Sequence, residues 1–154
     1  MGQIDKRIAE LGITLPEAAK PVANYVPWVR TGNLVFISGQ GPMADGKLIY
    51  TGALGNGVSI EDGTKSARLC GINVIAQLRD ACGGDLDKVK RIVKLVGFVN
   101  AAADFADHPK VINGASDLMV EVFGDKGRHA RSAVASPSLP FGISVEVEAI
   151  VEVE

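Results

Sequence analysis

Two ionisable side chains near the C-terminal end of the sequence lie among apolar neighbours. Arg131 opens the apolar segment RSAVAS, and Glu146 lies on the alternating segment VEVEAIVEVE. A planar guanidinium presents parallel donors that fit a carboxylate, which lysine cannot do. A glutamate in a partly dry cleft can orient water or move a proton. From the residues alone, however, an arginine at a strand end is more often solvated or ion-paired, and alternating glutamates are typical of a polar strand face.

Other chemistry has weaker support. The segment TGALGNGVS (51–59) is rich in glycine and precedes a predicted helix, so it could cradle a phosphate. It lacks the P-loop lysine and the dinucleotide-binding spacing, and we interpret it as a loop that rims a cleft. His108 and His129 are too few and too far apart in sequence to indicate a metal site. Ser132 has no evident histidine base, which argues against a hydrolytic triad.

The composition fits one soluble domain. The 154 residues are 47% hydrophobic and 22% charged, with a formal net charge of −2 and no basic stripe, so we expect no nucleic-acid partner. No apolar run reaches membrane-spanning length, and the polar start MGQIDKRIAE does not resemble a secretory signal. Cys70 and Cys82 lie about 18 Å apart along one predicted helix, too far for a disulfide. We therefore expect a cytoplasmic protein with reduced thiols.

Hydrophobic periodicity and capping residues predict an α+β domain with the order βββαβαββ. Strands are expected in a hairpin at 25–40 with a Thr-Gly-Asn turn, at 48–52, at 89–100, at 131–136 and at 143–154. Helices are expected at 59–82 and 108–124. Residues 1–24 are expected to form a helical extension, with a helix at 5–12 and a further short helical turn capped by Thr14. Residues 25–154 form the predicted main domain.

The two predicted helices can cover only one face of such a sheet. Yet LVFIS (34–38) and RIVKLVGFV (91–99) are almost continuously apolar, as in strands that are buried on both faces. The uncovered face is therefore expected to meet another subunit. Alternate residues of the last strand would place Val145 and Val147 toward the helices and Glu146 toward that junction, where a carboxylate needs water, a partner or a function.

Several segments together resemble one family. PVANYVPWVRTGNLVFISGQGP (21–42), HARSAVASPSLPFGISVEVEAI (129–150) and the predicted element order are similar to the Rid family. These are the reactive intermediate deaminases, also called YjgF-like or endoribonuclease L-PSP proteins. The resemblance covers roughly residues 25–154. It implies a chorismate-mutase-like fold, with one sheet and two helices on one face, and a homotrimer with three clefts between subunits.

The resemblance also implies a reaction and a set of site residues. Studied members hydrolyse enamines and imines such as 2-aminoacrylate to 2-keto acids and ammonia, without a metal or an organic cofactor. Arg131 matches the arginine that grips the substrate carboxylate, and Glu146 matches the glutamate that positions or activates water. The remaining matched positions line the pocket: Tyr25, Ser38, Gly39, Asn113 and Ala133.

The sequence departs from the family pattern at three places. Ala133 stands where active deaminases often carry cysteine, His129 stands where a proline is usual, and the N-terminal extension is longer than in the short form. These differences keep a second hypothesis open: a regulatory trimer that binds a small carboxylate-bearing ligand without efficient turnover. Ribonuclease activity is a third hypothesis, which the acidic composition disfavours. Chorismate-mutase chemistry is a fourth, permitted by the fold alone.

Overall fold

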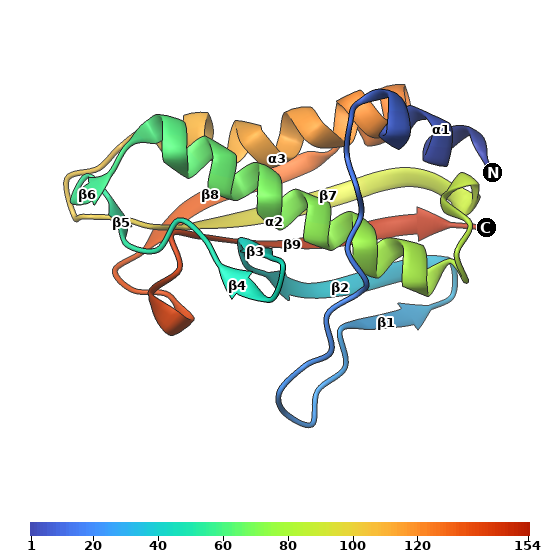
Figure 1. Ribbon diagram of the computed structural model, residues 1–154, viewed down its shortest axis with the longest axis horizontal. Helices are drawn as coiled ribbons and strands as arrows, with labels where there is room; N and C mark the ends of the chain where they lie inside the picture. Colours follow the sequence, from blue (N-terminus) through green and yellow to red (C-terminus); the bar gives the residue numbers. More distant parts are fainter.

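A computed structural model describes all residues from 1 to 154. Its centre is a five-stranded sheet in the order β1-β2-β9-β7-β8, in which β7 and β8 are parallel and the other neighbours are antiparallel. The strands are β1 Trp28–Thr31, β2 Leu34–Gln40, β7 Val89–Asn100, β8 Ala130–Ser136 and β9 Val145–Val153. Helices α2 (Ile60–Ala81) and α3 (His108–Phe123) cover one face (Figure 1). The predicted α+β class and helix placement are confirmed.

Local signals in the sequence set the ends of both long helices. The Ser59 hydroxyl accepts a hydrogen bond from the Asp62 amide at 3.1 Å, which caps α2. Pro109 lies in the first turn of α3, and Gly124 follows its last residue with a φ of +62°. The two helices pack side by side over the sheet.

Strand β9 places its alternate residues on opposite faces, as predicted. Its buried residues face the helices: Val145, Val147, Ala149, Val151 and Val153. The intervening residues, Glu146 among them, remain partly exposed on the other face. The buried set joins aliphatic side chains of α2, α3 and β7 in one continuous core. Burial of apolar surface contributes about 25 cal/mol per Å² to the free energy of folding, so this core is the main source of stability.

The prediction of a third strand of the sheet at 48–52 is wrong. This region instead forms two separate two-stranded ribbons. Their strands are β3 Met43–Ala44, β4 Lys47–Leu48, β5 Ala53–Leu54 and β6 Gly57–Val58. Tyr50 has a φ of +58° and Gly52 a φ of +109°. These left-handed values end the extended conformation after two residues, so the segment cannot pair along its length.

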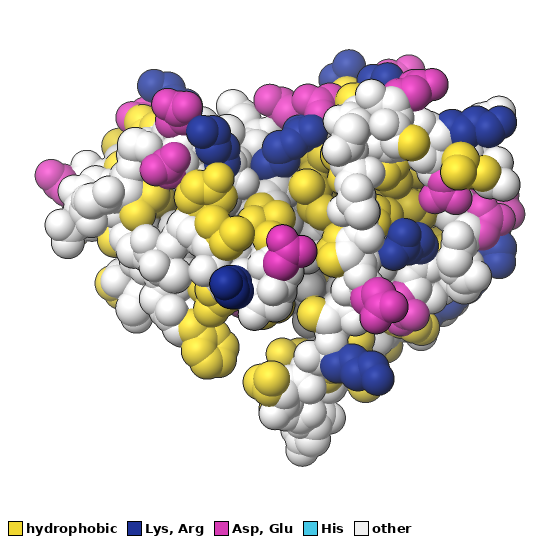
Figure 2. Space-filling model, viewed as in Figure 1, with side chains coloured by type: hydrophobic (Ala, Val, Ile, Leu, Met, Phe, Trp, Pro, Cys, Tyr) yellow, Lys and Arg dark blue, Asp and Glu magenta, His cyan; other side chains and the backbone are white.

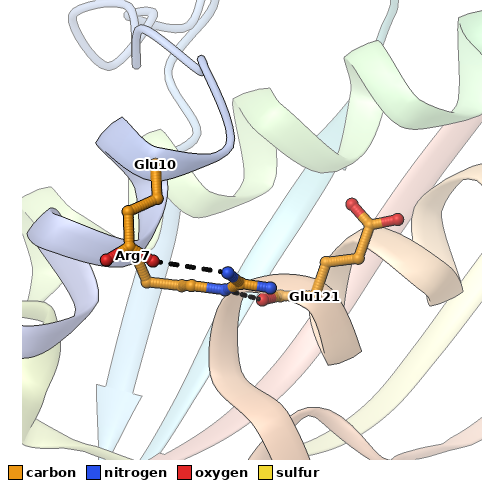
Figure 3. A network of polar contacts seen from close by, with 3 residues as sticks. All are labelled: Arg7, Glu10 and Glu121. Carbon is orange, nitrogen blue, oxygen red and sulfur yellow. Dashed lines mark hydrogen bonds and ion pairs between the residues drawn. The ribbon is translucent and has the colours of Figure 1, made fainter.

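The N-terminal helix α1 (Gln3–Glu10) is attached to the domain by its ends and its apolar face. Ile8 is buried in the main core. The Asp87 carboxylate accepts hydrogen bonds from the amides of Gln3 and Ile4, each at 2.9 Å, and these bonds hold the pKa of Asp87 below its usual range. Arg7 donates to the carbonyl of Glu121 on α3 at 2.8 Å (Figure 3).

Residues 13–24 contain no helix, so the predicted helical turn after Thr14 is wrong. The segment crosses α2 (Figure 1), and side chains of that helix bind its carbonyls. Gln77 Nε2 donates to the Ala19 carbonyl at 2.7 Å, and Arg79 donates to the Pro16 carbonyl at 3.0 Å. A short segment with few internal bonds gains too little to nucleate a helix. No helix in the protein combines the length and apolar character that crossing a membrane requires.

Candidate functional site

Arg131 lies on β8 and extends its side chain toward α3. One guanidinium nitrogen, Nη1, donates to Asn113 Oδ1 at 2.9 Å and to Ser116 Oγ at 3.0 Å. The other terminal nitrogen, Nη2, donates to the carbonyl of Pro109 at 3.4 Å. All three acceptors are uncharged, and Arg131 takes part in none of the five ion pairs of the protein. The positive charge is therefore held in place without being neutralised.

The hydrogen bonds to α3 leave part of the guanidinium free. An arginine side chain has five N–H donors, and the three bonds to α3 use both donors of Nη1 and one of Nη2. The Nε–H and the second N–H of Nη2 have no partner in the chain. These donors lie on adjacent nitrogens, where a carboxylate can accept both in the bidentate arrangement.

A second layer of hydrogen bonds supports Arg131 through Ser116. His129 Nδ1 lies 2.6 Å from the Gly127 carbonyl, and His129 Nε2 lies 2.9 Å from Ser116 Oγ. Because a carbonyl can only accept, Nδ1 carries the proton in the neutral ring, and Nε2 accepts the hydroxyl proton of Ser116. The lone pairs of Ser116 then face Arg131. These contacts together fix the position of Arg131 Nη1.

Glu146 lies on β9 and lines a cavity of about 260 Å³. Its carboxylate makes no hydrogen bond or ion pair within the chain. Burial raises its pKa above the ordinary value, and the neighbouring charge of Glu148 raises it further. Glycine at position 39 leaves room for the Glu146 side chain, because a methyl group on Gly39 would lie 2.8 Å from Glu146 Cδ. A carboxyl group with a raised pKa can exchange a proton more readily near neutral pH.

The cavity is built by loops at one end of β2 and β9. Tyr25 lines it from a bend before β1, rather than from a strand. Phe141 lines it from the loop between β8 and β9, with a φ of +60° and 80% of its surface exposed. The predicted pocket residue Ser38 is absent from the lining. Its hydroxyl donates to the Val26 carbonyl at 2.9 Å, and this bond holds the bend that carries Tyr25.

The site residues predicted from the sequence form two groups in one chain. Arg131 pairs with Leu95, whose side chain is buried under the helices, whereas Glu146 pairs with Phe98, three residues further along β7. Paired residues share a face, and residues three apart face opposite ways. Arg131, Asn113 and Ala133 thus lie on the helix side, and Glu146 lies on the other. Within a single chain, the side chains of Arg131 and Glu146 therefore do not face each other.

Two contributions were missed by sequence reasoning. Ser116 and His129 support Arg131, and the N-terminal segment Ala19–Val22 forms part of the cavity wall. Ser116 carried a usable signal, because it lies three residues after Asn113 and so shares its helix face. No local sequence pattern predicts that Ala19–Val22 lies against the cavity. Its position depends on hydrogen bonds between α2 and a segment without secondary structure.

Comparisons with known proteins extend over nearly the whole chain. The family model described as YjgF/chorismate mutase-like, putative endoribonuclease matches residues 5–153. The protein TCP17 of Trypanosoma cruzi is 47% identical over 98% of this chain and 94% of its own length. The crystal structure of Atu1372 from Agrobacterium tumefaciens, a protein of unknown function, is 48% identical. It covers 98% of this chain and 92% of its own, with a TM-score of 0.93.

A more distant structure contains a ligand. The crystal structure of E. coli TdcF with bound serine is 25% identical to this chain. It covers 90% of this chain and 94% of its own, with a TM-score of 0.65.

Proposed function

Because this chain belongs to the YjgF family, also called the Rid family, we propose that it hydrolyses 2-imino acids and their enamine tautomers to 2-keto acids and ammonia. The observation that carries the proposal is the state of Arg131. Its charge has only neutral partners, and two donors on adjacent nitrogens remain free. A small carboxylate satisfies both features at once. Serine, which is bound in the TdcF structure, has a carboxylate of this kind.

The proposed site is shared between subunits. The sheet face opposite the helices exposes apolar side chains that a monomer would leave in water, including Val29, Phe36 and Val134, which are 52%, 42% and 44% exposed. Covering this face with a second copy buries them. Arg131 lies on the edge strand β8 and Glu146 lies on the covered face, so the edge of one copy can bring its arginine to the glutamate of its neighbour. The resemblance to the family favours closure as a homotrimer with three such clefts.

The proposed reaction adds water across the C=N bond. Arg131 binds the substrate carboxylate and orients the imine carbon. The imine nitrogen enters the reaction protonated. Glu146 accepts a proton from the attacking water as the C–O bond forms, and the iminium nitrogen becomes a neutral amine. Glu146 then returns that proton to the amine, and the C–N bond breaks as ammonia leaves. Loss of the remaining hydroxyl proton to the released ammonia gives the carbonyl of the 2-keto acid. A raised pKa suits Glu146 to both transfers.

A binding protein without efficient turnover is the second candidate. Ala133, two residues after Arg131 on the same face of β8, presents a methyl group where active deaminases often have a thiol. Such a trimer would bind 2-keto acids but not accelerate imine hydrolysis. Ribonuclease activity has less support, because the net charge is −2 and Arg131 provides one localised cation rather than a basic groove.

Subunit mixing tests the shared site. Arg131→Ala and Glu146→Gln trimers, each with little activity, are unfolded together and refolded as a mixture. If each cleft takes Arg131 from one subunit and Glu146 from the next, about a quarter of the clefts regain both residues. Ammonia release from 2-imino acids generated by an amino-acid oxidase is the readout. Recovery supports the proposal, and a mixture as inactive as its parents contradicts the shared site. If the parent protein itself does not accelerate ammonia release, the proposed enzymatic activity is wrong.

A further inference from the structure

The cavity beside Glu146 is larger than the smallest substrates require. Its volume is about 260 Å³, whereas a water molecule occupies about 30 Å³ in the liquid. The methyl or methylene group of an alanine-derived imine would leave most of this space unfilled. Figure 2 shows hydrophobic side chains on both sides of a gap at the lower edge of the molecule.

The polar side chains of this cavity are largely engaged by the protein. Asn73 donates to the carbonyls of Gly41 and Met43, at 3.0 and 2.9 Å. Gln40 donates to the Ser38 carbonyl at 2.9 Å. Lys20 is exposed to solvent. The rest of the wall is mainly apolar, with side chains from the N-terminal segment, the β3–β4 ribbon and the β8–β9 loop: Pro21, Val22, Met43, Leu48, Phe141 and Ile143.

The N-terminal part of this wall is held in place from α2. Gln77 is 1% exposed and binds the Ala19 carbonyl, and Arg79 binds the Pro16 carbonyl three residues earlier. These bonds use only the backbone of the segment. Ala19 and Val22 both line the cavity. Gln77 and Arg79 therefore act as positioning residues for a wall that has no secondary structure of its own.

We infer that the segment Ala19–Val22 and Phe141 form a subsite for the side chain of the substrate, and that the protein prefers 2-imino acids with large apolar side chains. The inference rests on the proposed function, since the reacting carbon must lie beside Glu146 for the substituent to enter this cavity. Each additional buried CH₂ or CH₃ group then strengthens binding through the hydrophobic effect. Small substrates such as 2-aminoacrylate would gain nothing from the wall.

The experiment compares binding of the product acids pyruvate and 4-methyl-2-oxopentanoate by calorimetric titration, together with ammonia release from the corresponding imines. The larger acid has three more carbons to bury, and we expect it to bind about tenfold or more tightly. Ala19→Phe fills the cavity from an exposed position, so folding is preserved. It is expected to remove this preference, because it should weaken binding of the larger acid far more than binding of pyruvate. Ala23→Phe, one residue beyond this segment and outside the lining, is the matched control and should retain the preference.

Gln77→Leu tests the anchor in a second way, because it releases the Ala19 carbonyl without filling the cavity. It should reduce the preference for the larger acid and leave affinity for pyruvate unchanged. Equal affinity of the parent for both acids, or a preference that survives Ala19→Phe, would overturn the subsite while leaving imine hydrolysis intact. A parent that hydrolyses none of the imines overturns the proposed activity and the substrate preference with it. Turnover of the small imine alone overturns only the preference.

Discussion

Replacing Arg131 with lysine keeps the charge and removes the fork of donors. In the parent, Asn113 and Ser116 accept the hydrogen bonds of Nη1, and the Nε–H and one N–H of Nη2 remain for a ligand. A lysine ammonium has three donors at one point. If it stays bound to Asn113 and Ser116, it retains one donor for the carboxylate. A charge-assisted hydrogen bond contributes about 1.5–3 kcal/mol, so losing one should weaken 2-keto acid binding by about 10- to 150-fold.

Calorimetric titration of 2-oxobutyrate into the parent, Arg131→Lys and Arg131→Ala measures this effect. We expect both variants to bind much more weakly than the parent, and the melting temperature to change little, because Arg131 bonds only neutral surface groups. If Arg131→Lys binds 2-oxobutyrate as tightly as the parent does, Arg131 does not hold the carboxylate through two donors. Arg131 would then be a solvated cation. Exposed ion pairs of such a cation contribute only about 0–1 kcal/mol, which lysine can match.

Four further predictions concern Glu146, Ser116 and the open face of the sheet. Glu146→Gln should slow imine hydrolysis by about 10²- to 10⁴-fold while preserving ligand binding; unchanged turnover would show that this carboxylate is a polar strand residue. Because folding raises the Glu146 pKa above 4.5, the native state binds the proton more tightly, and the parent loses stability as pH rises through that raised value. The melting temperature of Glu146→Gln should therefore match the parent near pH 4 and equal or exceed it at pH 7, and a lower value at pH 7 contradicts this sign. Ser116→Ala should weaken 2-keto acid binding by about three- to tenfold, whereas Ser116→Thr, which keeps the hydroxyl, should bind like the parent. Phe36→Asp should abolish assembly in light scattering, whereas Ile49→Asp, at a similarly exposed residue outside the sheet, should leave it intact.

The sequence predicts those parts of the fold whose signals are local. Ser59, Pro109 and Gly124 mark helix ends that the structure confirms, and the alternation from Val145 to Val153 identifies the buried face of β9. The prediction of a strand at 48–52 failed because Tyr50 adopts a left-handed backbone conformation. This conformation favours glycine, so a tyrosine in the sequence does not indicate it. Thr14 resembled a helix cap, but the chain there bonds to α2 instead.

The resemblance proposes individual residues for the candidate site but not their arrangement. The resemblance identified Arg131 and Asn113, which the structure brings within 2.9 Å. It could not show that Arg131 and Glu146 lie on opposite faces, because that depends on which strands are neighbours. Strand β7 separates β8 from β9 in the sheet, and the register places Arg131 and Glu146 three residues apart along it. Pairing between distant segments carries no signature in the local pattern.

The position of β9 affects how the chain folds as it is synthesised. This strand is the last element of the domain in sequence, yet it lies at the centre of the sheet between β2 and β7. Val35 of β2 pairs with Val151, so the sheet depends on contacts between remote parts of the chain. Until residues 145–153 leave the ribosome, a nascent chain has no strand to join β2 to β7. High contact order of this kind slows folding, and the incomplete sheet would expose unpaired edges to other nascent chains. The domain should therefore complete its folding only after β9 has been translated. Pairing of β9 with β2 and β7 is then the step that commits the chain to its native structure.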